Sequence, residues 1–379
     1  MHADSFTLPE PDAAARAASR ALLARIDEAL QRGGNWMSFA RYMALALHAP
    51  GLGYYAGGAA KFGAPGDFVT APELGTLFAR TLARQVAELL SPGDAVLEFG
   101  AGSGALADAL THALAAIGAR PEYLILEPSA ELVERQRARV RAPVRWIAEL
   151  PARFRGVVIA NEVLDAMPVH ALAWTAQGVF ERGVCVNEGQ LSWCERPAEG
   201  ELLAAAQALR VESSERYESE LNLAARAWIR TLAERLDAGA ILVIDYGFPA
   251  REYYHPQRGG GTLMCHYRHR AHGDPFFLPG LQDITAHVDF SALAHAARET
   301  GLSVLGYANQ AQFLVNCGIT DLLGEADASD VRRYAPLAAE AQMLLSPAEM
   351  GELFKVLAIG RGSDGPLRGF TSGDRTHTL

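Results

Sequence analysis

The chain has 379 residues, of which 50% are hydrophobic, so it is long enough for one large domain or two ordinary ones. Its formal charge of −10 comes from 34 basic and 44 acidic side chains, without a dense run of Lys or Arg, which disfavours direct binding to nucleic acid. The 4 scattered cysteines form no CxxC pair and therefore favour a reducing compartment and no metal cage.

Residues 1–30 lack the apolar core of a signal peptide, and their acidic side chains count against an organelle presequence. No apolar run of about 18 residues, the length that a membrane helix needs, follows them. We therefore expect a soluble, cytoplasmic protein without a membrane span. A homodimer is an alternative that the sequence leaves open.

Apolar side chains at helical spacing predict three helices in the N-terminal part, over residues 13–31, 37–49 and 74–90. The first ends at a glycine pair that begins with Gly33, and Ser38 is placed to cap the second. Between the second and third helices, a segment rich in Gly and aromatic residues has no period of its own. Such a segment inside a compact protein is typical of a functional loop.

From residue 94 onwards, apolar strands alternate with helices. The predicted core elements are strands at 95–99, 122–128, within 156–168 and at 238–249, and helices at 105–117, 129–140 and 218–236. Ser129 is placed to cap the second of these helices. Strands at this spacing with helices between them indicate a parallel sheet covered on both faces. The predicted fold class is α/β, with a Rossmann-like doubly wound sheet.

The predicted domain organisation follows chain order, with an interruption in the core and an antiparallel strand pair that completes one sheet edge. Its parts are N-terminal helices and a covering loop at 1–90, the core at 91–250 with a β-hairpin inserted at 171–211, a cap and sheet-completing part at 251–361, and a disordered tail at 362–379.

Three glycines, Gly100, Gly102 and Gly104, follow the first core strand in "LEFGAGSGAL". In an open parallel sheet, the first strand-to-helix loop lies where ligands bind, and glycines let a ligand approach the main chain closely. The spacing fits a dinucleotide loop of the G-x-G-x-x-G/A type, so the glycines alone do not identify the ligand.

Glu98, two residues before the first glycine, separates the candidate ligands. A carboxylate there disfavours a pyrophosphate and favours a cationic ligand such as S-adenosylmethionine, which carries a sulfonium and an ammonium group. Glu127 ends the next strand, beside Pro128, where a carboxylate can accept both ribose hydroxyls of either ligand. The alternative for Glu98 is a local cap or ion pair.

The order of ten sequence blocks resembles the MidA-type family of S-adenosylmethionine-dependent methyltransferases, over roughly residues 37–360. The blocks are "GYY" (53–55), "GDFVTAPELGTLF" (66–78), "LEFGAGSGAL" (97–106), "ILEPS" (125–129), "NEVLDAMPV" (161–169), "DYG" (245–247), "GTLMCHYRHR" (261–270), "PGLQDITAHVDF" (279–290), "QAQFLVNCGI" (310–319) and "MGELFKVLAIG" (350–360).

The resemblance implies a class I methyltransferase core with S-adenosyl-L-methionine as cofactor. Mitochondrial members of this family assist assembly of respiratory complex I and are associated with arginine methylation of one of its subunits. An arginine-bearing protein, such as a complex I subunit, is therefore the implied partner, and the mitochondrial matrix is the implied location of eukaryotic relatives.

The family pattern also implies roles for residues on two segments. Asp67, Thr70 and Glu73 would close over the cofactor, and the alternative is that their loop is a docking surface. Asn161, also a cofactor candidate, precedes Glu162 and Asp165, which would orient an arginine guanidinium by bidentate contacts. The alternative is that Asn161 and Asp165 cap a following helix and Glu162 pairs with a local arginine.

Asp245 ends a core strand, and we interpret it as structural rather than catalytic. His266, His269 and His272 invite interpretation as a metal site, but nearby arginines and the absence of a known zinc spacing argue against it. His287, within a family block, is a candidate general base, and a structural histidine is the alternative.

Two rival functions remain at this point. A non-catalytic assembly factor would bind S-adenosylmethionine without turnover and use its cap as a docking surface. A nicotinamide-dependent oxidoreductase would rest on the glycine spacing alone.

Overall fold

The computed structural model describes residues 8–57, 70–209, 211, 216–362 and 365–379. The chain forms two compact units, each assembled from separate segments. Unit 1 comprises 1–68, 166–223 and 254–286, and unit 2 comprises 69–165, 224–253 and 287–379. This arrangement differs from the predicted organisation in chain order, because strands that are distant in sequence pair within one sheet.

Unit 2 is built on a sheet with the strand order β15-β16-β10-β5-β2-β3-β4. Its strands are β15 (Ser303–Asn309), β16 (Phe354–Arg361), β10 (Leu236–Phe248), β5 (Phe154–Asn161), β2 (Ala95–Phe99), β3 (Glu122–Leu126) and β4 (Val144–Ile147), with β14 (Val288–Asp289) beside the end of β10. The strands from β10 to β4 pair in parallel. In this sheet β16 pairs antiparallel with β10 on one side and with β15 on the other, which confirms the predicted antiparallel edge.

Strand order reverses at β2, which pairs with β3 on one side and with β5 on the other. In a parallel sheet, the strand ends at such a reversal form the ligand-binding edge. The glycine loop follows β2, and Asn161 is the last residue of β5. The fold therefore brings the two predicted halves of the site to one edge, as a class I methyltransferase sheet does.

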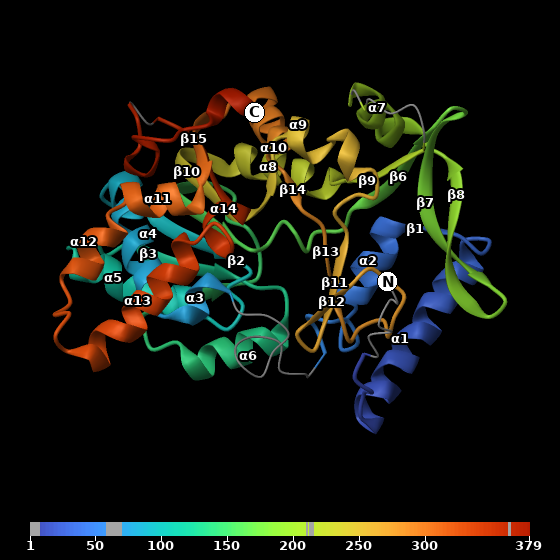
Figure 1. Cartoon of the computed structure of the whole chain (residues 1–379), viewed down its shortest axis with the longest axis horizontal. Helices are drawn as coiled ribbons and strands as arrows, with labels where there is room; N and C mark the ends of the chain where they lie inside the picture. Colours follow the sequence, from blue (N-terminus) through green and yellow to red (C-terminus); the bar gives the residue numbers. More distant parts are fainter. Residues whose placement is uncertain (1–7, 58–69, 210, 212–215, 363–364) are drawn as a thin grey trace. The chain divides into compact units, whose positions relative to one another are not determined.

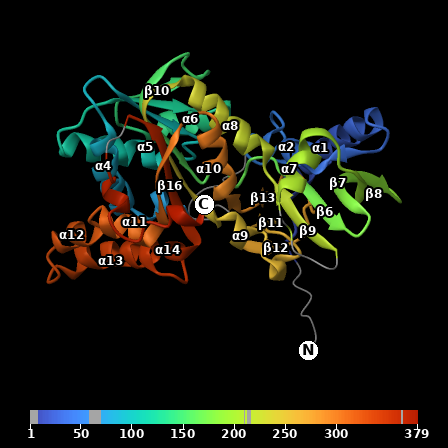
Figure 2. The same cartoon turned by 90° about the horizontal axis from the view of Figure 1, so that it is seen from above.

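Helices cover both faces of this sheet (Figure 1). One face packs its alternate residues against α4 (Leu77–Leu89), α5 (Ala105–Ala116), α11 (Gln310–Asn316), α12 (Ile319–Gly324) and α13 (Val331–Leu345). On the other face, Phe99 meets Trp228 of α8 (Leu223–Arg235), with ring centroids 5.1 Å apart, and Tyr307 meets Phe290 of α10 (Phe290–Glu299) at 5.3 Å. The helices α8 and α10 lie side by side in Figures 1 and 2. The predicted doubly wound α/β core is confirmed.

The described part of unit 2 has further α-helices. They are α3 (Ala71–Leu74), α6 (Ala130–Arg139), α9 (Ala250–Tyr253) and α14 (Met350–Leu353). Ser129 caps α6 by accepting a hydrogen bond from the Leu132 N–H, as predicted.

Unit 1 contains a sheet with the order β1-β7-β6-β9, in which β8 also pairs with β7, and a smaller sheet with the order β12-β11-β13. Its elements are α1 (Ala13–Arg32), β1 (Met37–Ser38), α2 (Phe39–His48), β6 (His170–Thr175), β7 (Gly178–Asn187), β8 (Gln190–Pro197), α7 (Gly200–Ala208), β9 (Tyr217–Leu221), β11 (Met264–Tyr267), β12 (Arg270–His272) and β13 (Asp283–Thr285). The predicted hairpin is present, since Asn187 faces Gln190 across the turn, but it belongs to this larger sheet rather than to the core.

Two further predictions are wrong. Residues 217–221 form the strand β9 rather than the start of a helix, because they pair with β6 over their whole length. The described part of the C-terminal tail is packed rather than disordered: Phe370 is buried and its ring lies 5.4 Å from that of Phe313. The Gly369 N–H donates to the Oε1 of buried Gln85 at 2.7 Å. No helix in the described part of the chain is long and apolar enough to span a membrane.

Candidate functional site

The glycine loop has a backbone that only glycine adopts easily. Gly100, Gly102 and Gly104 have φ values of 56°, 54° and 83°. The Gly100 N–H donates to the Leu126 carbonyl at the end of β3, at 3.3 Å. A Cβ atom on Gly104 would lie 2.6 Å from Cγ2 of Val140. The loop therefore exposes main chain at the strand ends and packs closely on the segment that follows α6.

Replacing Gly104 with alanine is expected to destabilise the protein by about 2 kcal/mol, from the left-handed backbone and the contact with Val140. Gly118→Ala is the matched control, because Gly118 has a φ of 86° and no atom within 4 Å of the added carbon. Denaturant unfolding of both variants measures the difference. Equal losses would show that the contact with Val140 relaxes without cost.

Glu127 follows β3 and is held by two donors. Its Oε1 accepts from the Ser129 N–H at 3.0 Å, and its Oε2 accepts from the Nε2 of Gln136 at 3.3 Å. Burial raises the pKa of Glu127, and these two hydrogen bonds oppose the rise. Each oxygen keeps a further lone pair, so the carboxylate suits a ligand with two adjacent hydroxyls. Pro128, beside it, is exposed.

Glu98 lies in the core of unit 2. It is 3% exposed, and it accepts a hydrogen bond from the hydroxyl of Tyr123 at 2.8 Å. Burial raises the pKa of Glu98 to about 7, with the Tyr123 hydrogen bond opposing the rise and the charge of Glu127 adding to it. Contact between Glu98 and the cofactor stays a prediction.

The short helix α3 is fixed to the glycine loop. Glu73 accepts from the hydroxyl of Ser103 and from the Nη1 of Arg139, the latter at 2.9 Å. Thr70 stands at the N-cap of α3 without a capping hydrogen bond from its side chain. The predicted cofactor residue Asp67 lies outside the described residues.

Asn161 and Glu162 stand at the end of β5. The Nδ2 of Asn161 donates to Oε1 of Glu162 at 3.1 Å, whereas its buried Oδ1 meets no donor among the described residues. Glu162 has a φ of 53°, and its N–H donates to the Ile244 carbonyl of β10 at 2.9 Å. The interpretation as helix caps is wrong, because turns and no helix follow β5 before β6. An unsatisfied acceptor at this edge fits the ammonium or hydroxyl groups of the cofactor.

Glu162, Asp165 and Asp245 form what we call the acidic cluster. Asp245 is fully buried and accepts from the N–H groups of Leu164 and Asp165, at 2.9 and 3.3 Å. Burial, followed by the charges of Asp165 and Glu162, raises the pKa of Asp245 well above its usual value. These contacts support the structural role predicted for Asp245, which positions the segment that carries Asp165.

Tyr246 connects the acidic cluster to His287. The hydroxyl of Tyr246 donates to Oδ2 of Asp165. The imidazole of His287 meets the rings of Tyr246 and Phe248 edge-on, with centroid distances of 5.3 and 5.2 Å. Among the predicted site residues in the described part of unit 2, Glu98 lies in β2, Asn161 ends β5, His287 precedes β14 and Thr70 precedes α3. The others lie on the segments that follow β2, β3 and β5: Gly100, Gly102, Gly104, Glu127, Pro128, Glu162 and Asp165.

Sequence analysis missed Arg139 and Gln136 as site residues. The sequence offered one signal for Gln136, because this polar residue lies between the apolar residues Leu132 and Val140 at helical spacing. In the structure Gln136 is fully buried. Among the described residues, no group of three or more His, Cys, Asp or Glu side chains converges as metal ligands do.

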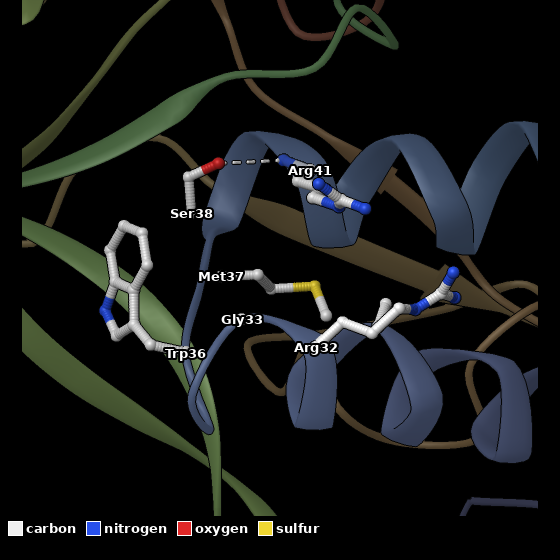
Figure 3. Close-up of a pocket in the computed structure, with 7 residues that line it drawn as sticks. Arg32, Gly33, Trp36, Met37, Ser38 and Arg41 are labelled. Carbon is white, nitrogen blue, oxygen red and sulfur yellow. Dashed lines mark hydrogen bonds between the residues drawn. The ribbon is translucent and has the colours of Figure 1, made fainter.

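Unit 1 carries a cavity of about 380 Å³ between the end of α1 and the start of α2 (Figure 3). Its lining residues are Ala29, Arg32, Gly33, Trp36, Met37, Ser38 and Arg41. The hydroxyl of Ser38 accepts from the Arg41 N–H at 3.2 Å, which confirms the predicted cap of α2. None of the residues predicted to bind cofactor or acceptor lines this cavity.

Known proteins resemble this chain over most of its length. A family model described as "Putative S-adenosyl-L-methionine-dependent methyltransferase" matches residues 77–308. A crystal structure from Burkholderia thailandensis bound to S-adenosyl-homocysteine is 52% identical, with a TM-score of 0.94, and the match covers 98% of this chain and 100% of that one.

Curated relatives are more distant. The mitochondrial protein arginine methyltransferase NDUFAF7 of Danio rerio is 29% identical over 366 residues, covering 85% of this chain and 83% of the relative. The Homo sapiens protein of the same name is 28% identical over 364 residues, covering 85% and 80%. Together with the sheet order and the glycine loop, these matches identify S-adenosylmethionine as the cofactor and exclude the nicotinamide alternative. The chain therefore belongs to the MidA-type family of S-adenosylmethionine-dependent methyltransferases.

Proposed function

We propose that this methyltransferase acts on an arginine side chain of a partner protein. The observation that carries the proposal is the acidic cluster, in which the charges of Asp165 and Glu162 both act on buried Asp245. Asp245 also accepts from the main-chain N–H groups of Leu164 and Asp165, which keeps this segment beside β10. Mutual repulsion among such carboxylates is relieved by a bound cation, and a guanidinium offers planar donors that match carboxylate oxygens. The names of the curated relatives support the same substrate class.

The residues divide between cofactor and acceptor. The main chain of the glycine loop, Glu127 and Asn161 bind S-adenosylmethionine, and Thr70, at the N-cap of α3, is a further candidate. Bound there, the cofactor supplies a methyl group made electrophilic by its positively charged sulfur. Glu162 and Asp165 hold the guanidinium so that one nitrogen faces that methyl group. Tyr246 fixes the orientation of Asp165 through its hydroxyl.

Charge balance requires a proton acceptor. When an arginine nitrogen gains the methyl carbon, the guanidinium must lose one proton to keep a single positive charge. His287 packs against Tyr246, whose hydroxyl reaches Asp165, and an imidazole accepts protons near neutral pH. We assign that task to His287.

The partner is an arginine-bearing protein, and the family resemblance makes a respiratory complex I subunit the first to test. The experiment incubates purified enzyme and methyl-tritiated S-adenosylmethionine with a cytoplasmic lysate of cells that lack this protein. Hydrolysis and amino-acid analysis then identify the labelled residue. Label in methylarginine is expected; label in another amino acid would refute the substrate class. Cofactor binding without any label would favour the non-catalytic assembly factor.

A further inference from the structure

Gln136 is a fully buried polar side chain on α6 whose hydrogen bonds connect three parts of unit 2. Its Nε2 donates to the Gly102 carbonyl at 3.0 Å and to Oε2 of Glu127 at 3.3 Å. Its Oε1 accepts from the indole N–H of Trp146 on β4 at 2.9 Å. Because an indole N–H only donates, Trp146 fixes which end of the amide faces the site.

The two groups that Gln136 joins belong to different predicted contacts of the cofactor. Gly102 is the middle of the glycine loop, and Glu127 is the carboxylate assigned to the ribose. With the Ser129 N–H on its other oxygen, the Glu127 carboxylate is held by one donor on each side. A carboxylate held in this way loses little freedom when a diol binds, so less binding free energy is spent on ordering it.

Packing alone does not require an amide at this position. Leu132 and Val140 are buried on the same face of the helix, and Val140 lies directly against the glycine loop. An apolar residue at 136 would extend that apolar face. A buried amide is favoured only where its polar atoms have partners, and both groups that its N–H bonds reach belong to the cofactor site.

We propose that Gln136, oriented by Trp146, is a positioning residue that holds Glu127 and the glycine loop in one arrangement for recognition of the ribose diol. This inference rests on the assignment of Glu127 to the ribose under the proposed function. It gives Gln136 a role in selecting ligands with both hydroxyls, beyond stabilising the fold.

The test compares the affinities of the whole protein for S-adenosylhomocysteine and for its 2′,3′-dideoxy analogue by titration calorimetry. Gln136→Met keeps the length of the side chain and removes its donors, and it is expected to reduce the preference for the diol about 10-fold. Trp146→Phe, a milder change, is expected to reduce it about 3-fold. Gln177→Met, at the exposed turn before β7, is the control and should keep the wild-type preference.

Glu127→Gln separates this proposal from the assignment beneath it. If Glu127→Gln keeps the diol preference, Glu127 does not bind the ribose and the assignment fails. If Glu127→Gln loses the preference while Gln136→Met and Trp146→Phe keep it, only the role of Gln136 is overturned. If Gln136→Met lowers the affinities for both ligands by the same factor, the preference is unchanged and the role of Gln136 is purely structural. When Gln136→Met is added to Glu127→Gln, we expect no further loss of preference.

Discussion

Replacing Glu162 with glutamine is expected to lower kcat/KM for methylation of an arginine-bearing protein about 100- to 1000-fold. Glutamine keeps the shape of the side chain but removes a charge that orients and neutralises the guanidinium. The loss should fall on the acceptor side, so affinity for S-adenosylhomocysteine should stay within about threefold of wild type. Methyl incorporation and calorimetry on the same preparation measure the two quantities.

Two further variants make this result interpretable. Asp165→Asn should behave like Glu162→Gln, because the two carboxylates are assigned to one guanidinium. Glu122→Gln changes an exposed glutamate at the start of β3, which pairs with Arg145 at the end of the strand opposite to Glu127. This variant should retain activity. Full activity in Glu162→Gln would exclude the proposed clamp.

Replacing Glu98 with glutamine should make the free energy of unfolding fall less as the pH rises. The folded protein raises the pKa of Glu98 from 4.5 to about 7, so between these values it binds more protons than the unfolded chain does. The contribution of Glu98 to the free energy of unfolding is therefore fully present below pH 4.5 and is lost as the pH rises through about 7. A difference of one pKa unit between the folded and unfolded states is worth 1.36 kcal/mol, so the difference for Glu98 corresponds to a loss of about 3 kcal/mol in the free energy of unfolding.

Urea unfolding of wild type and Glu98→Gln at pH 5 and pH 8 tests this expectation. The free energy of unfolding of the variant, relative to wild type, should increase by about 2 to 3 kcal/mol from the lower to the higher pH. A constant cost of burying the amide cancels in this comparison. An equal difference at both pH values would contradict the raised pKa, and Glu122→Gln serves as the surface control. Titration of Glu98→Gln with S-adenosylhomocysteine also tests the predicted contact with the cofactor.

Local patterns were enough to predict the elements that hold the site. Ser38 and Ser129 indicated where α2 and α6 begin, because an N-cap side chain bonds to a main-chain N–H within the first turn of the helix. The glycine loop was evident because its left-handed backbone selects glycine at three alternate positions. The strand ends that carry the site were predictable because each core strand is continuous in sequence and apolar.

Contacts between distant segments were not predictable in the same way. The hydrogen bond from Tyr246 to Asp165 depends on β5 and β10 ending side by side, which no local pattern encodes. The same applies to Gln136, whose partners lie on the glycine loop, β4 and the end of β3. The packed tail was missed because its contacts, which include buried Leu367 and Phe370 and the hydrogen bond from Gly369 to Gln85, follow no periodic pattern.

The position of β16 has a consequence for how the chain folds as it is synthesised. This strand lies between β10 and β15, both of which leave the ribosome before it. Until β16 inserts, β10 presents an open edge of buried apolar residues, including Ile241 and Val243, to other nascent chains. The edge of β10 therefore stays open to mispairing until the whole segment between Phe248 and Phe354 has been synthesised, because β16 follows that segment.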